Sequence, residues 1–307
     1  NKPVEEFQAA LQLNVGNYDR TYTQGMLNVP VSDEFQMRAA YFTDDRDGYF
    51  DLTSSKTGKD LDGGDSADDY GVRLHGLYQP SDTVSLLVSG DYLSREGTPA
   101  LQQDLPVEGN VFELTTTGEG ESDIEDQGIK AELNWQLNGA TLTYLTASRK
   151  TSFKVAGPAA GQSILADAFL IVDNHIKQIS HELRLTSESD NALQWITGLY
   201  YFNEKQDIYF QLRDILPLGP IKGDLTFDQP DVEATSKAIF GQANYDLTEK
   251  VQLSAGLRYT KDEKSRTGRS IVGIDETNTI LSEVPNIADD DWSKTTWKLG
   301  VDWFVRE

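Results

Sequence analysis

The sequence contains no cysteine and no long apolar run. Without cysteine, neither a disulfide framework nor a cysteine-ligated metal site can form. The longest apolar stretches, Ile164–Val172 and Ile215–Ile221, are far shorter than the ~20 residues that a membrane-spanning helix needs, and no signal peptide precedes Asn1. A helical membrane protein is therefore excluded. A membrane β-barrel is not, because its strands alternate in polarity and escape a hydropathy window.

Basic side chains are also scarce: 27 Lys and Arg stand against 50 Asp and Glu, which gives a formal net charge of −23. This charge repels phosphate backbones, so nucleic acid is not an expected partner. Catalytic motifs are missing as well. The three histidines, His75, His175 and His181, are scattered, and no HExxH, Gly-x-Ser-x-Gly or phosphate-binding glycine loop is present. We therefore expect neither an enzyme nor a bound cofactor.

Apolar and polar residues alternate along most of the chain. In HELRLTSESDNALQWITGLYYF (181–202), Leu183 and Leu185 alternate with polar neighbours, and after a polar turn Leu193, Trp195 and Leu199 do the same. A period of two indicates β-strands, whereas a helical period would mix charged residues into the apolar face. Twelve such strands are expected, centred on residues 7–15, 27–31, 35–41, 72–78, 84–92, 129–137, 141–147, 181–187, 193–201, 239–247, 251–259 and 295–303.

The connections between these strands alternate in length. Short turns, among them the strong hairpin signal Asn138-Gly139, alternate with long connections near 43–69, 94–126, 149–175, 203–234 and 261–291. The long ranges hold 35 of the 50 acidic side chains, so the acidity belongs to one end of the sheet. This pattern predicts an all-β fold, an antiparallel up-and-down sheet with one plain end and one elaborated end.

Two features favour a transmembrane barrel over a soluble sandwich. Aromatic residues such as Tyr78, Tyr201, Tyr259 and Trp303 recur near strand ends, which suits an interfacial girdle. The strands are also uniformly ~9–11 residues long, which is the span of a tilted membrane strand. On this interpretation the apolar face contacts outer-membrane lipid and the polar face lines the interior. The alternative is a soluble, secreted β-sheet protein with a binding or adhesive role.

Several stretches resemble the TonB-dependent outer-membrane receptors of bacteria. NKPVEEFQAALQLNVGNYDR resembles the junction between plug and first barrel strand, and NVPVSDEFQMRAAYFTDDRDGYFD is similar to the second and third strands. HELRLTSESDNALQWITGLYYF resembles a recurrent hairpin of the family, in which Gln is more usual at the position of His181. FGQANYDLTEKVQLSAGLRYTKDEK resembles a later hairpin of the same barrel. The resemblance covers nearly the whole chain.

This resemblance implies a partial barrel over residues 1–307, with about 12 of the family's 22 strands, the plug absent and the long loops extracellular. An open sheet leaves unpaired edges that are costly in hydrocarbon, so the missing strands would be needed to span the membrane. By the same resemblance, the complete receptor binds a ferric siderophore or similar scarce nutrient and imports it with force relayed by the TonB system through the plug. A receptor for carbohydrate or vitamin is the alternative within this family.

The expected polar face carries more cations than anions. It holds Arg38, Arg73, His75, Lys130, Arg184, Arg258 and Lys298, against Glu132, Glu182 and Asp302. One hypothesis is that these cations draw in anionic groups of a ligand, such as the carboxylates of a ferric chelate. The other is that they form salt bridges within the wall or with plug carboxylates.

Two long connections, 155–173 and 208–221, are unexpectedly apolar. Apolar loops of this length either pack on each other or contact a hydrophobic ligand, in which case Phe169, Tyr209, Phe210 and Leu216 are the candidate residues. An acidic stretch holds Asp60, Asp62, Asp65, Asp68 and Asp69, whose spacing is not that of an EF-hand. We expect a solvated loop there and no metal site.

Overall fold

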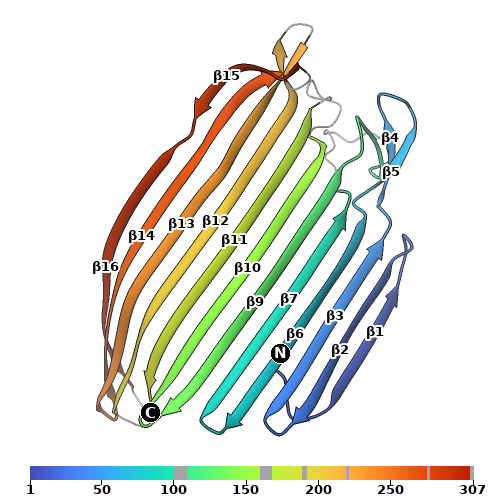
Figure 1. Cartoon of the computed structure of the whole chain (residues 1–307). Coiled ribbons are helices and arrows are strands. Elements are labelled where there is room, and N and C mark those ends of the chain that lie inside the picture. The colour runs from blue at the N-terminus through green and yellow to red at the C-terminus, as the bar shows by residue number, and fades with distance from the viewer. Residues whose placement is uncertain (100–108, 160–167, 189–191, 219–220, 275–276, 305–307) are drawn as a thin grey trace.

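The computed structural model describes residues 1–99, 109–159, 168–188, 192–218, 221–274 and 277–304. Twelve long strands form one antiparallel sheet, in which each strand pairs with the next (Figure 1). They are β1 (Gln8–Val15), β2 (Thr21–Ser32), β3 (Phe35–Arg46), β6 (Ala67–Ser81), β7 (Val84–Gly97), β9 (Glu121–Leu137), β10 (Ala140–Pro158), β11 (Phe169–Ser187), β12 (Leu193–Leu218), β13 (Ile221–Thr248), β14 (Val251–Ile274) and β16 (Ala288–Trp303). The structure thus confirms the all-β, up-and-down fold and its twelve predicted strands.

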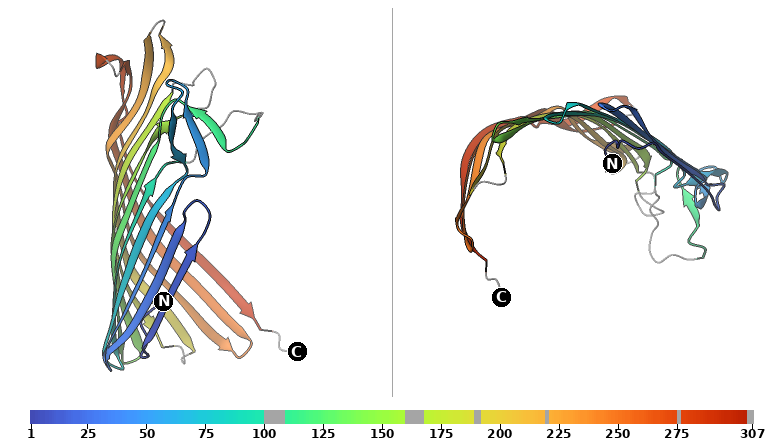
Figure 2. Two further views of the ribbon diagram at one scale, coloured as in Figure 1. Left: turned by 90° about the vertical axis from the view of Figure 1, so that its right-hand side faces the viewer. Right: turned by 90° about the horizontal axis from the view of Figure 1, so that it is seen from below.

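The sheet is a single curved layer with two open edges. Seen along its length it forms an arc, and the N-terminus lies inside that arc (Figure 2). In the described part of the chain β1 pairs only with β2, and β16 only with β14. One short strand, β15 (Thr279–Pro285), continues the pairing beside the far end of β14. The arc therefore has a concave face and a convex face, separated by one backbone.

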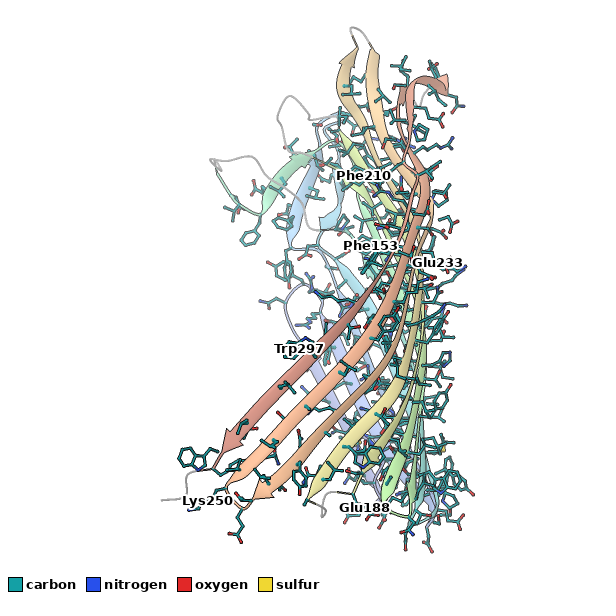
Figure 3. All side chains as sticks on the ribbon, turned by 90° about the vertical axis from the view of Figure 1, so that its left-hand side faces the viewer. Phe153, Glu188, Phe210, Glu233, Lys250 and Trp297 are labelled. Carbon is teal, nitrogen blue, oxygen red and sulfur yellow. The ribbon has the colours of Figure 1, made fainter. Side chains whose placement is uncertain are left out.

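Register determines which residues share a face. Leu133, Tyr144 and Leu183 are directly opposite one another on β9, β10 and β11, and the same row continues through Leu199 and Ile239. This row lies on the convex face, and no second protein layer covers it: Leu199 is 53% exposed and Trp297, on the edge strand, 73% (Figure 3). The apolar residues are therefore not buried between two stacked sheets, as they would be in a sandwich.

The five short turns lie together at one end of the sheet, which we call the short-turn end. Glu188 and Lys250 mark this end (Figure 3). At the Asn138-Gly139 turn, Gly139 adopts a φ of 83°, which explains the glycine there. In the described part of the chain, no helix is long and apolar enough to cross a membrane.

At the opposite, long-connection end, strands extend into every range that the sequence assigned to a long connection. β12 has 26 residues and β13 has 28, so these two strands continue through most of 203–234. A small three-stranded sheet, β5 (Asp60–Gly64), β4 (Phe50–Ser54) and β8 (Glu113–Thr116), fills parts of 43–69 and 94–126. Backbone pairing continues there although apolar and polar residues no longer alternate regularly, as in Ile208–Leu212, so alternation in the sequence ends before the strands do.

Candidate functional site

The concave face gathers four of the predicted site residues near its first edge. Arg38 is directly opposite His75, His75 opposite Ser89, and Ser89 opposite Lys130. The Nδ1 atom of His75 is 2.7 Å from the Ser89 hydroxyl. His75, Ser89 and Lys130 of this row, together with Arg73 and Lys2, border a cavity of about 420 Å³. The strand order therefore brings Arg38, Arg73, His75 and Lys130 into one polar patch.

A second row, one step toward the long-connection end, is organised by Arg149. Its Nη2 donates to both oxygens of Asp91, at 3.1 and 2.9 Å, and its Nη1 donates to Asp126. Gly128 is directly opposite both Asp91 and Arg149, and a Cβ there would be 2.7 Å from Nη2 of Arg149. The glycine thus leaves room for the guanidinium to bridge β7, β9 and β10. The sequence analysis missed this residue, because it placed Arg149 at the start of a long connection.

Ion pairing divides the predicted cations into two groups. Lys130 pairs with Glu132 and Arg184 with Glu182, each at 3.3 Å. Arg38, Arg73, Arg258 and Lys298 form no ion pair with any residue that the structure describes. The carboxylate opposite Arg73 is Asp91, which Arg149 already holds. Arg258 instead lies 5.7 Å from the ring centroids of Tyr200 and Phe240.

The predicted cations are not all neighbours. Arg184 pairs with Gly198 on β12, and Phe240 separates it from Arg258 on β14. Lys298 is on the edge strand β16, opposite Gly256. These three line the far half of the concave face, several strands from Arg73. The cationic residues therefore form two patches on one wall, and Arg38 with Arg73 belong to the patch that also has a cavity.

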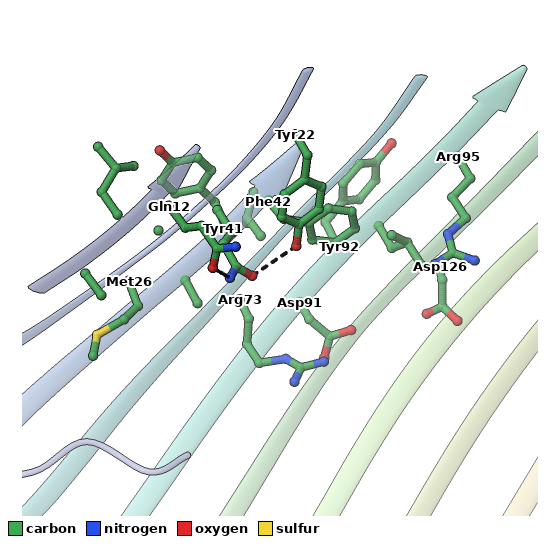
Figure 4. A pocket seen from close by; sticks show the side chains of 18 of the residues that line it. Gln12, Tyr22, Met26, Tyr41, Phe42, Arg73, Asp91, Tyr92, Arg95 and Asp126 are labelled. Carbon is green, nitrogen blue, oxygen red and sulfur yellow. Dashed lines mark hydrogen bonds between the residues drawn. The ribbon is translucent and has the colours of Figure 1, made fainter. Parts of the chain in front are cut away.

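A larger cavity of about 720 Å³ adjoins this patch toward the first edge of the sheet (Figure 4). Aromatic rings of Tyr22 and Phe42 line it, with centroids 6.5 Å apart. The Tyr22 hydroxyl donates to Gln24, whose amide donates in turn to Gln12. Arg73, Asp91 and Arg149 border both cavities. The wall therefore presents aromatic rings, side-chain amides and the unpaired guanidinium of Arg73 to two adjoining cavities.

Asn28 fixes the N-terminal segment against the concave wall. Its side chain is fully buried, and its amide nitrogen donates to the carbonyls of Val4 and Glu6, at 2.8 and 2.7 Å. Its Oδ1 accepts a hydrogen bond from the Val4 N–H at 3.0 Å. The sequence analysis missed this role. The sequence carries no signal for it, because the partners of Asn28 are backbone groups.

The apolar candidates do not form one surface. Phe210 pairs with Val172 and shares the concave side, whereas Phe169 and Tyr209 are one strand position out of phase and lie on the other side. Leu216 is close to the end of β12, opposite Gly223. Part of the stretch 155–173 falls outside the described residues. Of the four candidates, Phe210 alone combines an aromatic ring with the concave side.

Some of the acidic residues at the long-connection end form ion pairs. Asp65 is 3.6 Å from Arg46 and Asp69 is 3.4 Å from Arg95, while the side chain of Asp62 is outside the described set. Within the described residues, no cluster of His, Cys, Asp and Glu could hold a metal ion. Further out, hydrogen bonds to Glu283 and Asp228 raise the pKa of Arg269. Cross-strand pairing thus absorbs part of the acidic excess.

Comparison with known proteins identifies the family. The family described as "TonB dependent receptor-like, beta-barrel" matches residues 13–307, so the chain belongs to it. Its members are receptors of the bacterial outer membrane and not a class of enzymes. The chain is accordingly an outer-membrane β-barrel chain.

Solved structures share the fold at low sequence identity. The ferric yersiniabactin uptake receptor FyuA from Yersinia pestis is 13% identical, with a TM-score of 0.79, over 100% of this chain and 46% of that one. The open form of the ferric-catecholate import receptor Fiu from E. coli K12 is 13% identical, with a TM-score of 0.70, over 100% and 54%. The copper transporter OprC is 10% identical, with a TM-score of 0.64, over 98% and 44%. The chain spans about half the length of these proteins.

Proposed function

We propose that this chain forms part of a receptor that binds a scarce nutrient at its concave face and imports it with force from the TonB system, acting through a plug. The favoured ligand class is an anionic chelate of ferric iron. Two of the three similar structures named above are described as receptors for ferric compounds, which supports this class. Binding of this kind needs positioned charges and rings and no covalent chemistry.

The observation that carries the proposal is the unpaired charge of Arg38 and Arg73. Because Arg38 is opposite His75 and Arg73 is two residues from His75, the two cations are diagonal neighbours on adjacent strands. Neither has a carboxylate partner within the described residues, whereas Lys130 and Arg184 do. Guanidinium groups bind carboxylates through two parallel hydrogen bonds, so the unpaired Arg73, which lines both cavities, and Arg38 beside it are suited to an anionic ligand.

Charge reversal tests the proposal. Arg73→Glu should lower the affinity for ferric citrate, used as a polyanionic probe, by roughly ten- to hundredfold, because it replaces an attraction with a repulsion in a cavity. Arg184→Glu is the matched control: Arg184 has its own carboxylate partner and should change the affinity less. Titration calorimetry on the purified protein measures both. Unchanged affinity in Arg73→Glu, with the barrel still folded, would refute the anionic-ligand version.

A second test concerns the β12–β13 hairpin. Phe210 lies on the concave side where this hairpin rises above the wall (Figure 3). Deleting 208–221 should weaken ligand binding and leave barrel assembly intact, as judged by heat-modifiable migration in gels. Phe210→Ala should reproduce part of the loss, whereas Tyr209→Ala, on the other side of the same strand, should not. Equal effects of the two single substitutions would contradict a direct contact.

A further inference from the structure

Three lysines form a row on the convex face of the sheet. Lys150 on β10 is directly opposite Lys177 on β11, and Lys177 is directly opposite Lys205 on β12. Directly opposed residues have Cβ atoms about 4.5–5.5 Å apart, and like charges in such pairs are destabilising. All three side chains are exposed. The row concentrates three positive charges within about 10 Å, the width of two strand spacings.

Two other lysines on the convex face, unlike Lys237, have carboxylate partners. Lys154 pairs with Glu121 at 2.8 Å, and Lys261 pairs with Glu263 at 2.7 Å and with Asp291 at 3.5 Å. In the row, Lys205 has one weak contact, 3.7 Å to Glu233. Lys150 and Lys177 form no ion pair with any described residue. The protein itself thus leaves most of the charge of this row uncompensated.

The row lies just beyond an aromatic band on the same face. Tyr144, His181 and Tyr201 are opposite or diagonal to one another, and the His181 ring stacks with both tyrosines at centroid distances of 6.2 and 6.0 Å. Lys177 follows His181 by four residues, and Lys205 follows Tyr201 by four, toward the long-connection end. At about 3.3 Å per residue and a tilt of about 40°, the lysines are roughly 10 Å above the band. That is the depth of lipid headgroups when the aromatic band is at the edge of the hydrocarbon.

We propose that Lys150, Lys177 and Lys205 form a binding site for a phosphate-bearing lipid headgroup of the outer leaflet, with the acyl chains against the apolar belt below. Three observations support a lipid as the occupant. The row is continuous with the surface that faces lipid, its charge is complementary to phosphate, and its flexible amino groups can reach down along the wall. A headgroup with two phosphates can bridge neighbouring lysines and offset their mutual repulsion.

Lipid binding by the protein purified from outer membranes in a phosphate-free detergent tests this site. The probes are a diphosphorylated glucosamine-disaccharide lipid, the same lipid without its phosphates, and inorganic phosphate. The triple variant Lys150→Gln, Lys177→Gln, Lys205→Gln should bind the phosphorylated lipid roughly ten- to hundredfold more weakly. The control variant Lys250→Gln, Lys264→Gln, Lys294→Gln removes as many charges from the turn and the concave face and should bind normally.

Three outcomes would overturn the proposal. The first is equal binding by the two triple variants, and the second is an equal loss of affinity for the dephosphorylated lipid. The third is displacement of the lipid by inorganic phosphate at similar concentration, which would make the site one for free phosphate.

A second measurement separates binding from folding. Without phosphorylated lipid, Lys177→Gln should not lower the temperature of barrel unfolding, because it relieves repulsion. With the lipid, the parent protein should gain more stability than the variant. A variant that is less stable without lipid and gains as much from it would count against the site.

Discussion

The convex and concave faces of this sheet differ although the same strands form both. On the convex face, Leu199 and Leu257 are exposed side chains, and no other described part of the chain covers them. On the concave face, oppositely charged side chains pair with each other, as in the bridge of Arg149 to Asp91 and Asp126. Because only one backbone separates the two environments, a residue's position in the alternation decides whether an apolar or a charged side chain is tolerated there.

The largest expected effect comes from placing one charge on each face of the same strand. Ile239 and Gln242 are both on β13, three residues apart, and face the convex and concave sides respectively. Ile239→Arg should destabilise the folded barrel in lipid by about 2–4 kcal/mol, while Gln242→Arg should cost close to nothing. Urea unfolding in vesicles, followed by tryptophan fluorescence, measures both. Similar losses of unfolding free energy for the two variants would contradict the assignment of an apolar environment to the convex face and a polar one to the concave face.

An intermediate effect is expected from Asn28. Replacing it with Ala leaves the Val4 N–H and two carbonyls without their buried partner, which should cost about 1–3 kcal/mol locally. The amide of Val4 should then exchange hydrogen faster, while the amides of β2 and β3 remain protected. Asn14→Ala is the control, since Asn14 is exposed and makes one contact, to Gln12 at 3.3 Å. Unchanged exchange at Val4 would show that Asn28 does not hold the segment.

The smallest effect should come from the arginine bridge. Arg149→Met leaves Asp91 and Asp126 without their shared cation, but the group is partly exposed, so water and salt offset much of the loss and about 1 kcal/mol is expected. Adding Asp126→Asn to Arg149→Met should recover part of it, because one of the two unpaired charges is removed. Urea midpoints in low and high salt provide the measurement. No recovery in the double variant would mean that Arg149 acts by packing and not by charge.

Alternation in the sequence was sufficient to predict the twelve strands, because the two faces of each strand meet different media. In β14, Leu253 and Leu257 alternate with Ser254 and Arg258, as the structure confirms. The signal stops where apolar residues no longer fall on one face only, as in Ile208–Leu212, so the outer halves of β12 and β13 were assigned to a connection. Placement of the cations on one face was predictable for the same reason.

Their pairing was not predictable, because it depends on register between distant segments. Arg149 meets Asp91, 58 residues earlier in the chain, only when three strands are aligned. Asn28 was invisible for another reason: its partners are backbone groups, which every residue has, so nothing in the surrounding composition marks it. The row of three lysines on the convex face likewise exists only once β10, β11 and β12 are in register.

The length of the β12–β13 hairpin has a consequence for how far the chain extends beyond the membrane. A 26-residue strand measures roughly 85 Å along its axis, about three times the thickness of the hydrocarbon that it must cross. The hairpin therefore extends well beyond the neighbouring strands (Figure 1). In the orientation that the family resemblance implies, with the long-connection end outside the cell, antibodies, phage tails and bacteriocins should contact this hairpin before any other described part of the wall.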